Sequence, residues 1–386
     1  MNLEVDFAGL KLKNPVTVAS GTFGYGREYS DFYDLGKLGA IITKGTSLKP
    51  RNGNKPSRVC ETPSGMLNSI GLQNPGVEYF AQNDLPFLRK FDTKIIVNAC
   101  GNTVEDYVEL CRVLNSLDID AVELNLSCPN VKQGCLAFGT TYEGVKNVTS
   151  RCRKVLDKPL IVKLTPNVTD ITETAKAVED AGADGVSLIN TLLGMSIDIE
   201  KQRPFLANNT GGLSGPAIKP VAVRMVYQVA QKVNIPVLGL GGIVNGNDAV
   251  EFMLAGAKAI SIGCGNFIDP YAAPKTVEGI EDYLKRHNIE DVNDIVGKVK
   301  MNWFFEMGTV LFWKRNRPRL KKEPSPFEKI LIFQSQSIQI FINQSMNSSQ
   351  SSLIIRFQAI FNKLRMINQK FSHSIIRIIK ISINKI

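Results

Sequence analysis

Eight short apolar runs recur along the first two thirds of the chain, each followed by a polar or glycine-rich stretch and then a helical pattern. Most runs are apolar at every position, as strands buried on both faces of a parallel sheet are. Eight such units within about 250 residues are typical of an α/β fold of the TIM (β/α)8-barrel type. We therefore predict strands over residues 15–19, 40–44, 94–99, 121–127, 159–164, 185–190, 236–240 and 259–263.

The main structural alternative is a doubly wound parallel sheet, which usually has fewer strands. Its dinucleotide-binding fingerprint is absent, because the GLGG segment at 239–242 does not continue as G-x-G-x-x-G. Residues 3–7 and 10–13 flank Ala8 and Gly9, a pattern that predicts an N-terminal β-hairpin closing the bottom of the barrel. Helices are expected in the amphipathic stretches 105–117, 171–181 and 217–233.

Charge divides the chain near residue 300. Residues 301–386 hold 14 Lys and Arg against 3 Asp and Glu, whereas residues 1–300 hold 32 against 33. The basic character therefore belongs to the C-terminal part and gives no support to a nucleic-acid-binding catalytic domain. We expect a catalytic domain over residues 1–300 and a C-terminal extension, outside any family pattern, over residues 301–386.

The predicted extension is basic and rich in Ile, Ser and Asn. Residues 330–355 carry no charge, and residues 353–380 interleave apolar with basic side chains. This composition would suit a helix on a membrane surface or an arm for an anionic partner. We favour a third interpretation, a poorly ordered extension, because the uncharged stretch has the composition of an aggregation-prone segment.

The seven cysteines are scattered singly, with no Cys-x-x-Cys pair. This spacing argues against a structural zinc site or an iron–sulfur cluster on this chain, and it suits a reducing cytosol. No signal segment opens the sequence, and no apolar run reaches the roughly 18 residues of a transmembrane helix. We expect a cytoplasmic protein with no bound metal and no membrane span. Neither His287 nor His373 lies in a segment that resembles a site.

Polar or glycine residues stand at the carboxyl ends of the predicted strands, where barrels of this kind build their sites. A single Asn there is weak evidence, because Asn often caps strands and turns. Seven of eight strand ends with this chemistry indicate a common binding site. The residues concerned are Lys44, Gly45, Asn98, Asn125, Lys163, Asn190, Thr191, Gly241, Gly242, Gly263 and Cys264.

The last two predicted strands end in glycines, as the phosphate-binding strands of TIM barrels do. The segment 211–216 (GGLSGP) is expected to add a third flexible stretch rich in backbone donors. Bare backbone N–H groups can hold a phosphate without a charged side chain. We therefore predict that a cofactor phosphate binds on this side of the barrel mouth.

Two lysines lie at or inside predicted strands. Lys163 interrupts an apolar run, where an ammonium group is costly to bury without an anionic partner. A cation beside the N1/O2 edge of an isoalloxazine would stabilise an anionic reduced flavin. The same argument applies to Lys44, with a flavin oxygen or a substrate carboxylate as its partner.

Cys128 follows the fourth strand in the segment NLSCPN (125–130), and Pro129 stops the strand there. A lone cysteine is usually an inert buried residue. The loop that follows contains two glycines, which suits a lid that carries a thiol over the barrel mouth. Because no suitable His is available, we predict that the Cys128 thiolate is the general base. Cys135 competes for this role but lacks the support of a strand end.

Eight segments form a recognisable series: SGTFGYG (20–26), NSIGLQNPG (68–76), ELNLSCPNVKQG (123–134), GTTYEG (139–144), KLTPN (163–167), GGLSGPAIKP (211–220), GLGGI (239–243) and IGCGNF (262–267). Together they resemble the class 1 dihydroorotate dehydrogenases, and most closely the 1B type, the catalytic subunit of the NAD-linked enzyme. The resemblance runs from residue 1 to about 300. Class 2 enzymes use a Ser base and an N-terminal membrane extension, and this sequence shows neither.

The resemblance implies one FMN per chain. Cys264 departs from the family, which usually has Thr or Ser there, and the missing hydroxyl would weaken phosphate binding modestly. Cys135 is a second departure, and no function follows from it. The FMN would be lined by Ser20, Lys44, Gly45, Asn98, Asn125, Lys163, Ile189, Gly215, Gly241, Gly242, Gly263 and Cys264.

The resemblance further implies oxidation of (S)-dihydroorotate to orotate in pyrimidine (UMP) biosynthesis. Cys128 would take the C5 proton while the C6 hydride passes to the flavin. Amide side chains suit a ring of alternating C=O and N–H groups, and Lys44 suits its carboxylate. The residues implied to hold the substrate are Lys44, Asn68, Ser69, Ile70, Gly71, Leu72, Asn125, Asn190 and Thr191.

The electron acceptor depends on the type. The 1B type implies a homodimer assembled into a heterotetramer with a subunit that carries FAD and a [2Fe–2S] cluster and relays electrons to NAD. The 1A type is a homodimer that reduces fumarate directly. The VKQG segment at 131–134 favours the 1B type.

Three other functions stay open at this point. One is a related flavin barrel acting on another pyrimidine, such as uracil. Another is an RNA-acting flavin barrel with the basic extension as its RNA arm. The third is a non-catalytic interaction protein. Turnover of dihydroorotate but not dihydrouracil, retained after truncation at Lys300, would exclude all three.

Overall fold

The computed structural model describes residues 1–127 and 138–300. Internal contacts divide the chain into the units Met1–Val299 and Lys300–Ile386. Only Lys300 of the second unit is described, so the predicted extension over residues 301–386 stays a prediction.

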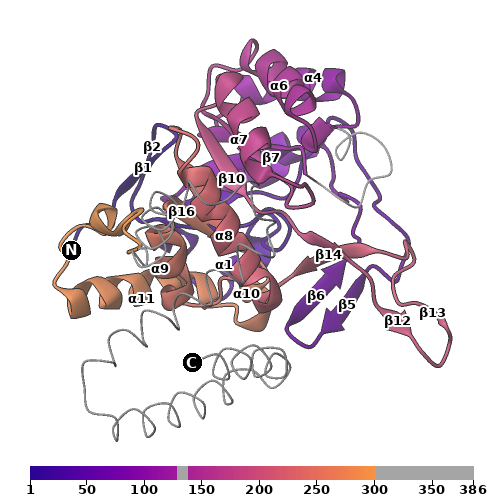
Figure 1. The fold of residues 1–386 in the computed structure, drawn as a ribbon. Coiled ribbons are helices and arrows are strands. Elements are labelled where there is room, and N and C mark those ends of the chain that lie inside the picture. The colour runs from indigo at the N-terminus through magenta and orange to yellow at the C-terminus, as the bar shows by residue number, and fades with distance from the viewer. Residues whose placement is uncertain (128–137, 301–386) are drawn as a thin grey trace, which may run out of the picture. The chain divides into compact units, whose positions relative to one another are not determined.

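Eight parallel strands close a barrel in the first unit (Figure 1). Each lies within two residues of its predicted bounds, and the TIM-barrel prediction is confirmed. The strands pair in chain order, and the last pairs with the first. They are β3 (Val16–Val18), β4 (Ala40–Ile42), β7 (Lys94–Ala99), β8 (Ala121–Asn125), β9 (Leu160–Lys163), β10 (Gly185–Leu188), β15 (Val237–Leu240) and β16 (Ala257–Ile262).

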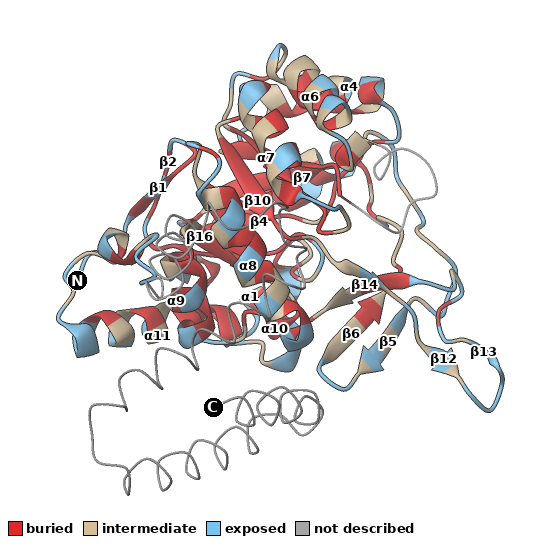
Figure 2. Ribbon diagram, viewed as in Figure 1, coloured by how far each residue is buried: buried red, intermediate tan, exposed pale blue. Residues whose placement is uncertain are grey.

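The barrel strands are the most deeply buried part of the described chain (Figure 2). Only Lys94 and Lys258, near the amino ends of β7 and β16, are half-buried, and every other strand residue is buried. Side chains on one face of each strand fill the barrel, and those on the other face pack against helices. This arrangement explains why the strands are apolar at nearly every position instead of alternating.

Helices follow the strands and cover the outside of the barrel (Figure 1). The sequence-predicted helices at 105–117, 171–181 and 217–233 correspond to α4, α7 and α8. Four of the longer helices begin at a side chain that accepts a hydrogen bond from a backbone N–H of the first turn, which fixes where each one starts; these caps are Thr103, Thr141, Asp170 and Asn245. The longer helices are α4 (Val104–Asn115), α6 (Tyr142–Arg153), α7 (Ile171–Asp180), α8 (Lys219–Ala230), α9 (Gly246–Leu254) and α11 (Ala272–His287). The short ones are α1 (Arg27–Ser30), α2 (Val77–Tyr79), α3 (Leu85–Leu88) and α10 (Gly265–Ile268).

The predicted N-terminal hairpin is present as β1 (Val5–Phe7) and β2 (Leu10–Leu12), paired antiparallel. Its turn residues Ala8 and Gly9 have φ of +55° and +79°, as the tight turn of a two-residue hairpin requires. A Cβ added at Gly185, the first residue of β10, would lie 3.2 Å from Cζ of Phe7. The hairpin therefore packs against the amino ends of the strands, at the bottom of the barrel.

A second, four-stranded antiparallel sheet stands beside the barrel (Figure 1). Its strands come from the connections that follow β4 and β10, in the order β11 (Leu192–Gly194), β14 (Gly211–Ser214), β6 (Gly65–Asn68) and β5 (Val59–Thr62). The expectation of a flexible segment at 211–216 was therefore wrong for its first four residues, because β14 is hydrogen-bonded between β6 and β11. A further small hairpin pairs β12 (Ile197–Asp198) with β13 (Arg203–Pro204).

Candidate active site

Buried polar side chains from neighbouring strands form one hydrogen-bonded network at the carboxyl end of the barrel. Asn98 Nδ2 donates to Glu123 Oε2 over 2.6 Å, and Ser187 Oγ donates to Glu123 Oε1 over 2.6 Å. Asn125 Nδ2 donates in turn to Asn98 Oδ1 over 3.2 Å. We call this network and its immediate neighbours the polar wall, which comprises Asn98, Glu123, Asn125, Ser127, Lys163, Ser187 and Asn190.

The network continues beyond the end of β10. Asn190 Nδ2 donates to Ser127 Oγ over 2.7 Å and lies 3.5 Å from Asn125 Oδ1. Ser127 Oγ donates to Asn125 Oδ1 over 3.1 Å. The backbone N–H of Thr191 donates to Asn190 Oδ1 over 2.7 Å. The structure thus brings together the predicted site residues Asn98, Asn125, Asn190 and Thr191.

Lys163 lies inside the barrel next to this network. The register of β8 and β9 pairs it with Asn125, and the register of β9 and β10 pairs it with Ser187. Lys163 is only 4% exposed, and it forms no ion pair with any residue in 1–127 or 138–300. A buried ammonium group is costly unless it has an anionic or strongly polar partner. This position therefore fits an anionic ligand at the barrel mouth.

Lys44 and Gly45 follow the end of β4, next to Asn98 of the polar wall. Lys44 is half-buried, and its backbone N–H donates to the carbonyl of Gly24 over 2.8 Å. A Cβ added at Gly45 would lie 3.1 Å from Asn98 Oδ1 and 3.5 Å from Leu72 Cδ2. Glycine at position 45 therefore leaves room for Asn98 and Leu72 to lie side by side.

The predicted substrate segment 68–72 divides in two. Asn68 is the last residue of β6, and its Nδ2 donates to the carbonyl of Gly212 over 3.4 Å. Gly212 packs so closely on Thr191 that a Cβ there would collide with the threonine hydroxyl. Asn68 and Thr191 therefore both lie next to Gly212, which has no side chain to separate them.

The middle of that segment faces a different residue. The carbonyl and hydroxyl oxygens of Ser69 lie 3.1 and 3.4 Å from Asn54 Nδ2, and the carbonyl of Ile70 accepts from the Asn54 N–H over 2.9 Å. Gly71 and Leu72 follow with φ of +79° and +58°, and this turn carries the chain to the Leu72 contact with Gly45.

The other half of the barrel mouth is built from backbone. We call Gly215, Gly241, Gly242 and Gly263 the glycine wall. Three of these glycines have positive φ, at +103°, +128° and +80° for Gly215, Gly241 and Gly242. A Cβ on Gly242 would lie 2.9 Å from the carbonyl oxygen of Gly215, and one on Gly241 would lie 3.3 Å from Ile189 Cγ1. The crowding and the positive φ require glycine at Gly215, Gly241 and Gly242, whereas a Cβ at Gly263 would meet only Ala19 Cβ, at 3.7 Å.

Two more predicted residues border the glycine wall. Cys264 Sγ lies 3.5 Å from the Cβ position of Gly215, and burial raises the pKa of the Cys264 thiol although Ser214 forms a hydrogen bond with it. The thiol therefore stays neutral at neutral pH and places no negative charge beside an anion. Ser20 is buried just past the end of β3, and the preceding Ala19 lies 3.7 Å from the Cβ position of Gly263.

Sequence reasoning missed three members of the network. Glu123 lies in the run AVELN and is fully buried, so the cost argument that identified Lys163 applies to it equally. Ser187 is hidden in an apolar strand, and no sequence signal marks it. Tyr107, on α4, donates from its hydroxyl to the backbone carbonyl of Asn125 over 2.7 Å. Cys128 and its competitor Cys135 lie outside the described residues.

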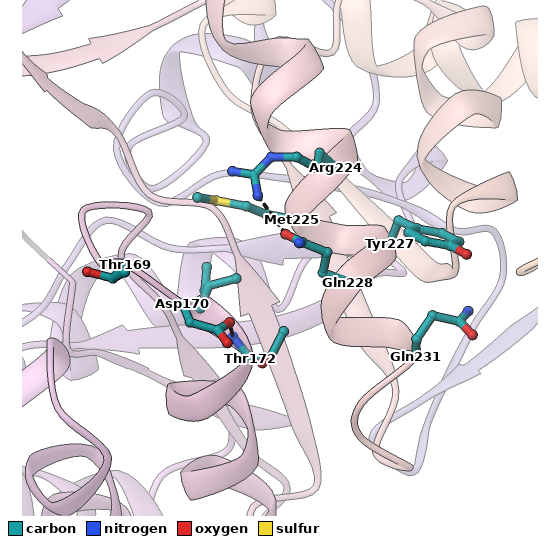
Figure 3. A pocket seen from close by; sticks show the side chains of 9 residues that line it. Thr169, Asp170, Thr172, Arg224, Met225, Tyr227, Gln228 and Gln231 are labelled. Carbon is teal, nitrogen blue, oxygen red and sulfur yellow. Dashed lines mark hydrogen bonds between the residues drawn. The ribbon is translucent and has the colours of Figure 1, made fainter. Parts of the chain in front are cut away.

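A separate cavity of about 510 Å³ lies outside the barrel, between the start of α7 and the side of α8 (Figure 3). Its lining includes none of the predicted site residues. Asp170 Oδ1 there accepts from the Thr172 N–H over 2.8 Å, and Arg224 Nη1 donates to Gln228 Oε1 over 2.7 Å. Its charged groups are thus already engaged in capping and helix-surface contacts.

Comparisons with known proteins point in one direction. The model of the family described as dihydroorotate dehydrogenase matches residues 2–284. A protein of Alkaliphilus oremlandii named dihydroorotate dehydrogenase B (NAD(+)), catalytic subunit, is 58% identical over 298 residues, which is 77% of this chain and 99% of that protein. Proteins with the same name from Porphyromonas gingivalis and Geotalea uraniireducens are 57% and 58% identical, over 75% and 77% of this chain and 95% and 97% of their own lengths.

No group of three or more His, Cys, Asp or Glu in residues 1–127 and 138–300 is arranged to hold a metal ion. No helix in the same ranges is long and apolar enough to cross a membrane.

Proposed function

The chain belongs to the dihydroorotate dehydrogenase family, and from that premise we propose that it oxidises (S)-dihydroorotate to orotate in pyrimidine biosynthesis as the catalytic subunit of an NAD-linked enzyme. The observation that carries this proposal is the polar wall, in which three linked asparagine side chains lie beside the buried Lys163. Linked amides suit a ring of alternating C=O and N–H groups. The printed names of the relatives support the NAD-linked type.

The family is flavin-dependent, and the barrel mouth fits FMN. The glycine wall would hold the phosphate, because glycines leave their backbone N–H groups uncovered by side chains and so accessible to an anion. Lys163 would supply the cation that the isoalloxazine ring needs on reduction, which accounts for its burial without an ion-pair partner in residues 1–127 or 138–300. A bound FMN would supply the acceptor for the hydride from C6 of the substrate. Further FMN contacts would come from Ser20, Lys44, Gly45, Asn98, Asn125, Ile189 and Cys264.

The substrate would lie between the polar wall and the end of β4. Asn125 and Asn190 of the polar wall would contact one part of the ring, and Thr191, its neighbour Asn68 and the turn up to Leu72 would contact another. Lys44 would bind the carboxylate, because it is the predicted site residue with a cationic side chain just past the end of β4. Ser69, Ile70 and Gly71 complete the proposed substrate segment, although Ser69 and Ile70 face Asn54 and would act by shaping the turn.

Cys128 is proposed as the base that takes the C5 proton. Ser127, the residue before it, is held by Asn125 and Asn190 at the carboxyl end of β8, so the chain leaves the barrel at the substrate position. A thiol with a reference pKa of about 8.5 is mostly protonated at neutral pH. The rate of substrate oxidation should therefore rise with pH through the alkaline range. A rate that stays flat there, with chemistry limiting, would count against this assignment.

The electrons would leave through a partner. The relatives are named catalytic subunits, which supports a second subunit, and we propose that this subunit carries FAD and a [2Fe–2S] cluster. A homodimer of this chain would bind two copies of the partner, in the cytoplasm. The alternative, a 1A-type enzyme, would reduce fumarate without a partner.

The function is tested by purifying the chain and recording its absorption spectrum. We expect a flavin spectrum that dihydroorotate bleaches under anaerobic conditions and that dihydrouracil leaves unchanged, because dihydrouracil lacks the carboxylate for Lys44. Bleaching by dihydrouracil alone would overturn the substrate assignment. Oxidation of the reduced protein by NAD only when the partner subunit is present would support the NAD-linked type, and direct oxidation by fumarate would contradict it.

A further inference from the structure

Glu123 is a buried carboxylate in the middle of the polar wall. Its side chain is fully buried, and each of its oxygens accepts one short hydrogen bond, from Asn98 and from Ser187. It forms no ion pair with any Lys or Arg in the described ranges, and even Lys163 is not within 4.0 Å. Burying a carboxyl group in this way is costly, since two neutral donors replace all of its water.

An ionised carboxylate can only accept hydrogen bonds, whereas an amide side chain has one accepting and one donating end. Asn98 must therefore turn its Nδ2 toward Glu123, which leaves its Oδ1 toward Asn125. Asn125 must then present Nδ2 to Asn98, which leaves its Oδ1 toward Ser127 and Asn190. Glu123 thus sets the direction of Asn98, and Asn98 together with the Ser127 N–H, which donates to Asn125 Oδ1 over 3.4 Å, sets that of Asn125. Asn190 is oriented separately, because the Thr191 N–H donates to its Oδ1 over 2.7 Å.

A reversal at Asn98 would not stay local. If its amide flipped, two NH2 groups would face each other between Asn98 and Asn125, and Asn125 would have to flip as well. The NH2 group of Asn125 would then meet that of Asn190. The donors and acceptors that the polar wall presents to a ligand would then be exchanged, and a ligand that matches the original pattern would bind less well.

We propose that Glu123 is a positioning residue that fixes the amide orientation of Asn98 and, through Asn98, supports that of Asn125, and so sets the donor–acceptor pattern that these two residues present to the substrate. This inference rests on the proposed function only for the identity of the ligand. Glu123 acts two amides away from the ring and transfers no proton. What it supplies is an obligatory acceptor for Asn98.

Two substitutions test whether Glu123 acts as a hydrogen-bond acceptor for Asn98 or only fills the space in the barrel. Glu123→Gln keeps an oxygen for Asn98 if its amide nitrogen turns toward Ser187, whose hydroxyl can accept as well as donate. Glu123→Met has similar volume and offers no strong acceptor, so Asn98 is free to flip. The matched control is Asp184→Leu, which removes a carboxylate that accepts from Arg153 and from the Leu160 N–H at the opposite end of the barrel.

The readout is the dissociation constant of orotate, measured by the change in flavin absorption, together with the FMN dissociation constant and the thermal unfolding midpoint. We expect Glu123→Met to weaken orotate binding about tenfold or more, since one lost well-oriented contact is worth about that factor. Glu123→Gln should stay within about threefold of wild type. Asp184→Leu should lower the midpoint and leave orotate binding unchanged.

Two outcomes overturn the inference. Orotate binding of wild-type strength in Glu123→Met would show that the acceptor is irrelevant, and equal weakening in both variants would show that only the charge of Glu123 counts.

If Glu123→Met is poorly folded, the double variant with Asn98→Asp in the Glu123→Gln background provides a second test, because the new carboxylate at position 98 can only accept from Asn125. That pair should bind orotate better than Asn98→Asp alone, and failure to do so contradicts the inference. If the wild type itself does not bind orotate, the proposed function has failed, and the same pairwise coupling in thermal unfolding still tests the orientation.

Discussion

The two halves of the barrel mouth differ in what they present to a ligand, since one presents side chains and the other presents backbone. The polar wall is made of side chains that hold one another, from Glu123 through Asn98 to Asn125. The glycine wall is made of backbone from which side chains are excluded, as at Gly241 and Gly242. Recognition in the first half depends on which atoms donate and accept, and in the second on whether an anion can approach the chain at all.

This difference predicts different kinds of damage. A substitution in the polar wall should change how the substrate binds or reacts while the cofactor stays in place. A substitution in the glycine wall should expel the cofactor by steric hindrance, whatever the chemistry of the new side chain. Lys163 lies in the polar wall, and we expect it to contribute to the binding of both the substrate and FMN.

The largest effect is expected for Lys163→Met. Loss of the cation should slow flavin reduction by dihydroorotate on the order of 100-fold, the usual cost of one preorganised charge or donor. The same change should stabilise the FMN-free chain by about 1–3 kcal/mol, because it removes a buried ammonium group that has no ion-pair partner in the described part of the chain. Stopped-flow absorption and thermal unfolding measure the two effects.

A lysine that does have partners serves as the control for stability. Lys219 pairs with Asp248 and Glu251 over 2.8 and 2.7 Å, and these contacts raise the pKa of Lys219. Lys219→Met should therefore lower the unfolding midpoint. If both methionine variants shift the midpoint in the same direction, the account of Lys163 as a buried cation without an ion pair among the described residues is wrong.

An intermediate effect is expected for Gly242→Ala. The new Cβ would lie 2.8 Å from Lys219 Cβ and 2.9 Å from the Gly215 carbonyl, at a φ of +80° that alanine adopts only with strain. We expect the FMN dissociation constant to rise about tenfold. Gly9→Ala is a matched control, since Gly9 has φ of +79° and open space around it. Fluorescence titration of FMN into both apoproteins should distinguish them, and equal affinities would show that crowding at Gly242 is irrelevant.

The smallest effect is expected for Cys264→Thr. The side chain lies at the edge of the glycine wall, and a hydroxyl would add one hydrogen-bond donor where the neutral thiol is a weak one. We expect the FMN dissociation constant to fall two- to fivefold with no change in the rate of flavin reduction. Weaker FMN binding in this variant would place Cys264 away from the phosphate.

Much of the fold was predictable because the parallel barrel imposes a simple pattern. Strands buried on both faces must be apolar throughout, so all eight could be located to within two residues. Lys163 was predictable for the converse reason, since a charge in such a strand needs a function. Glu123 carries the same signal and was overlooked, although its two hydrogen bonds could not have been foreseen.

Other features could not be predicted because they depend on contacts between distant segments. The sheet of β11, β14, β6 and β5 joins two connections more than 100 residues apart, and neither has a strong strand pattern by itself. The place of Asn68 at the end of β6, and its approach to Thr191 through Gly212, follow only from that pairing. Sequence patterns report local periodicity and burial, and they carry no information on such register.

The account is tested most directly by anaerobic reduction of the bound flavin with dihydroorotate in Cys128→Ala and Cys135→Ala. Both cysteines follow β8 in sequence, and only Cys128 adjoins Ser127, which the polar wall holds in place. We predict that Cys128→Ala keeps its flavin and loses at least 100-fold in the rate of reduction, whereas Cys135→Ala changes little. Reduction of Cys128→Ala at the wild-type rate would contradict the proposal that the polar wall places the base.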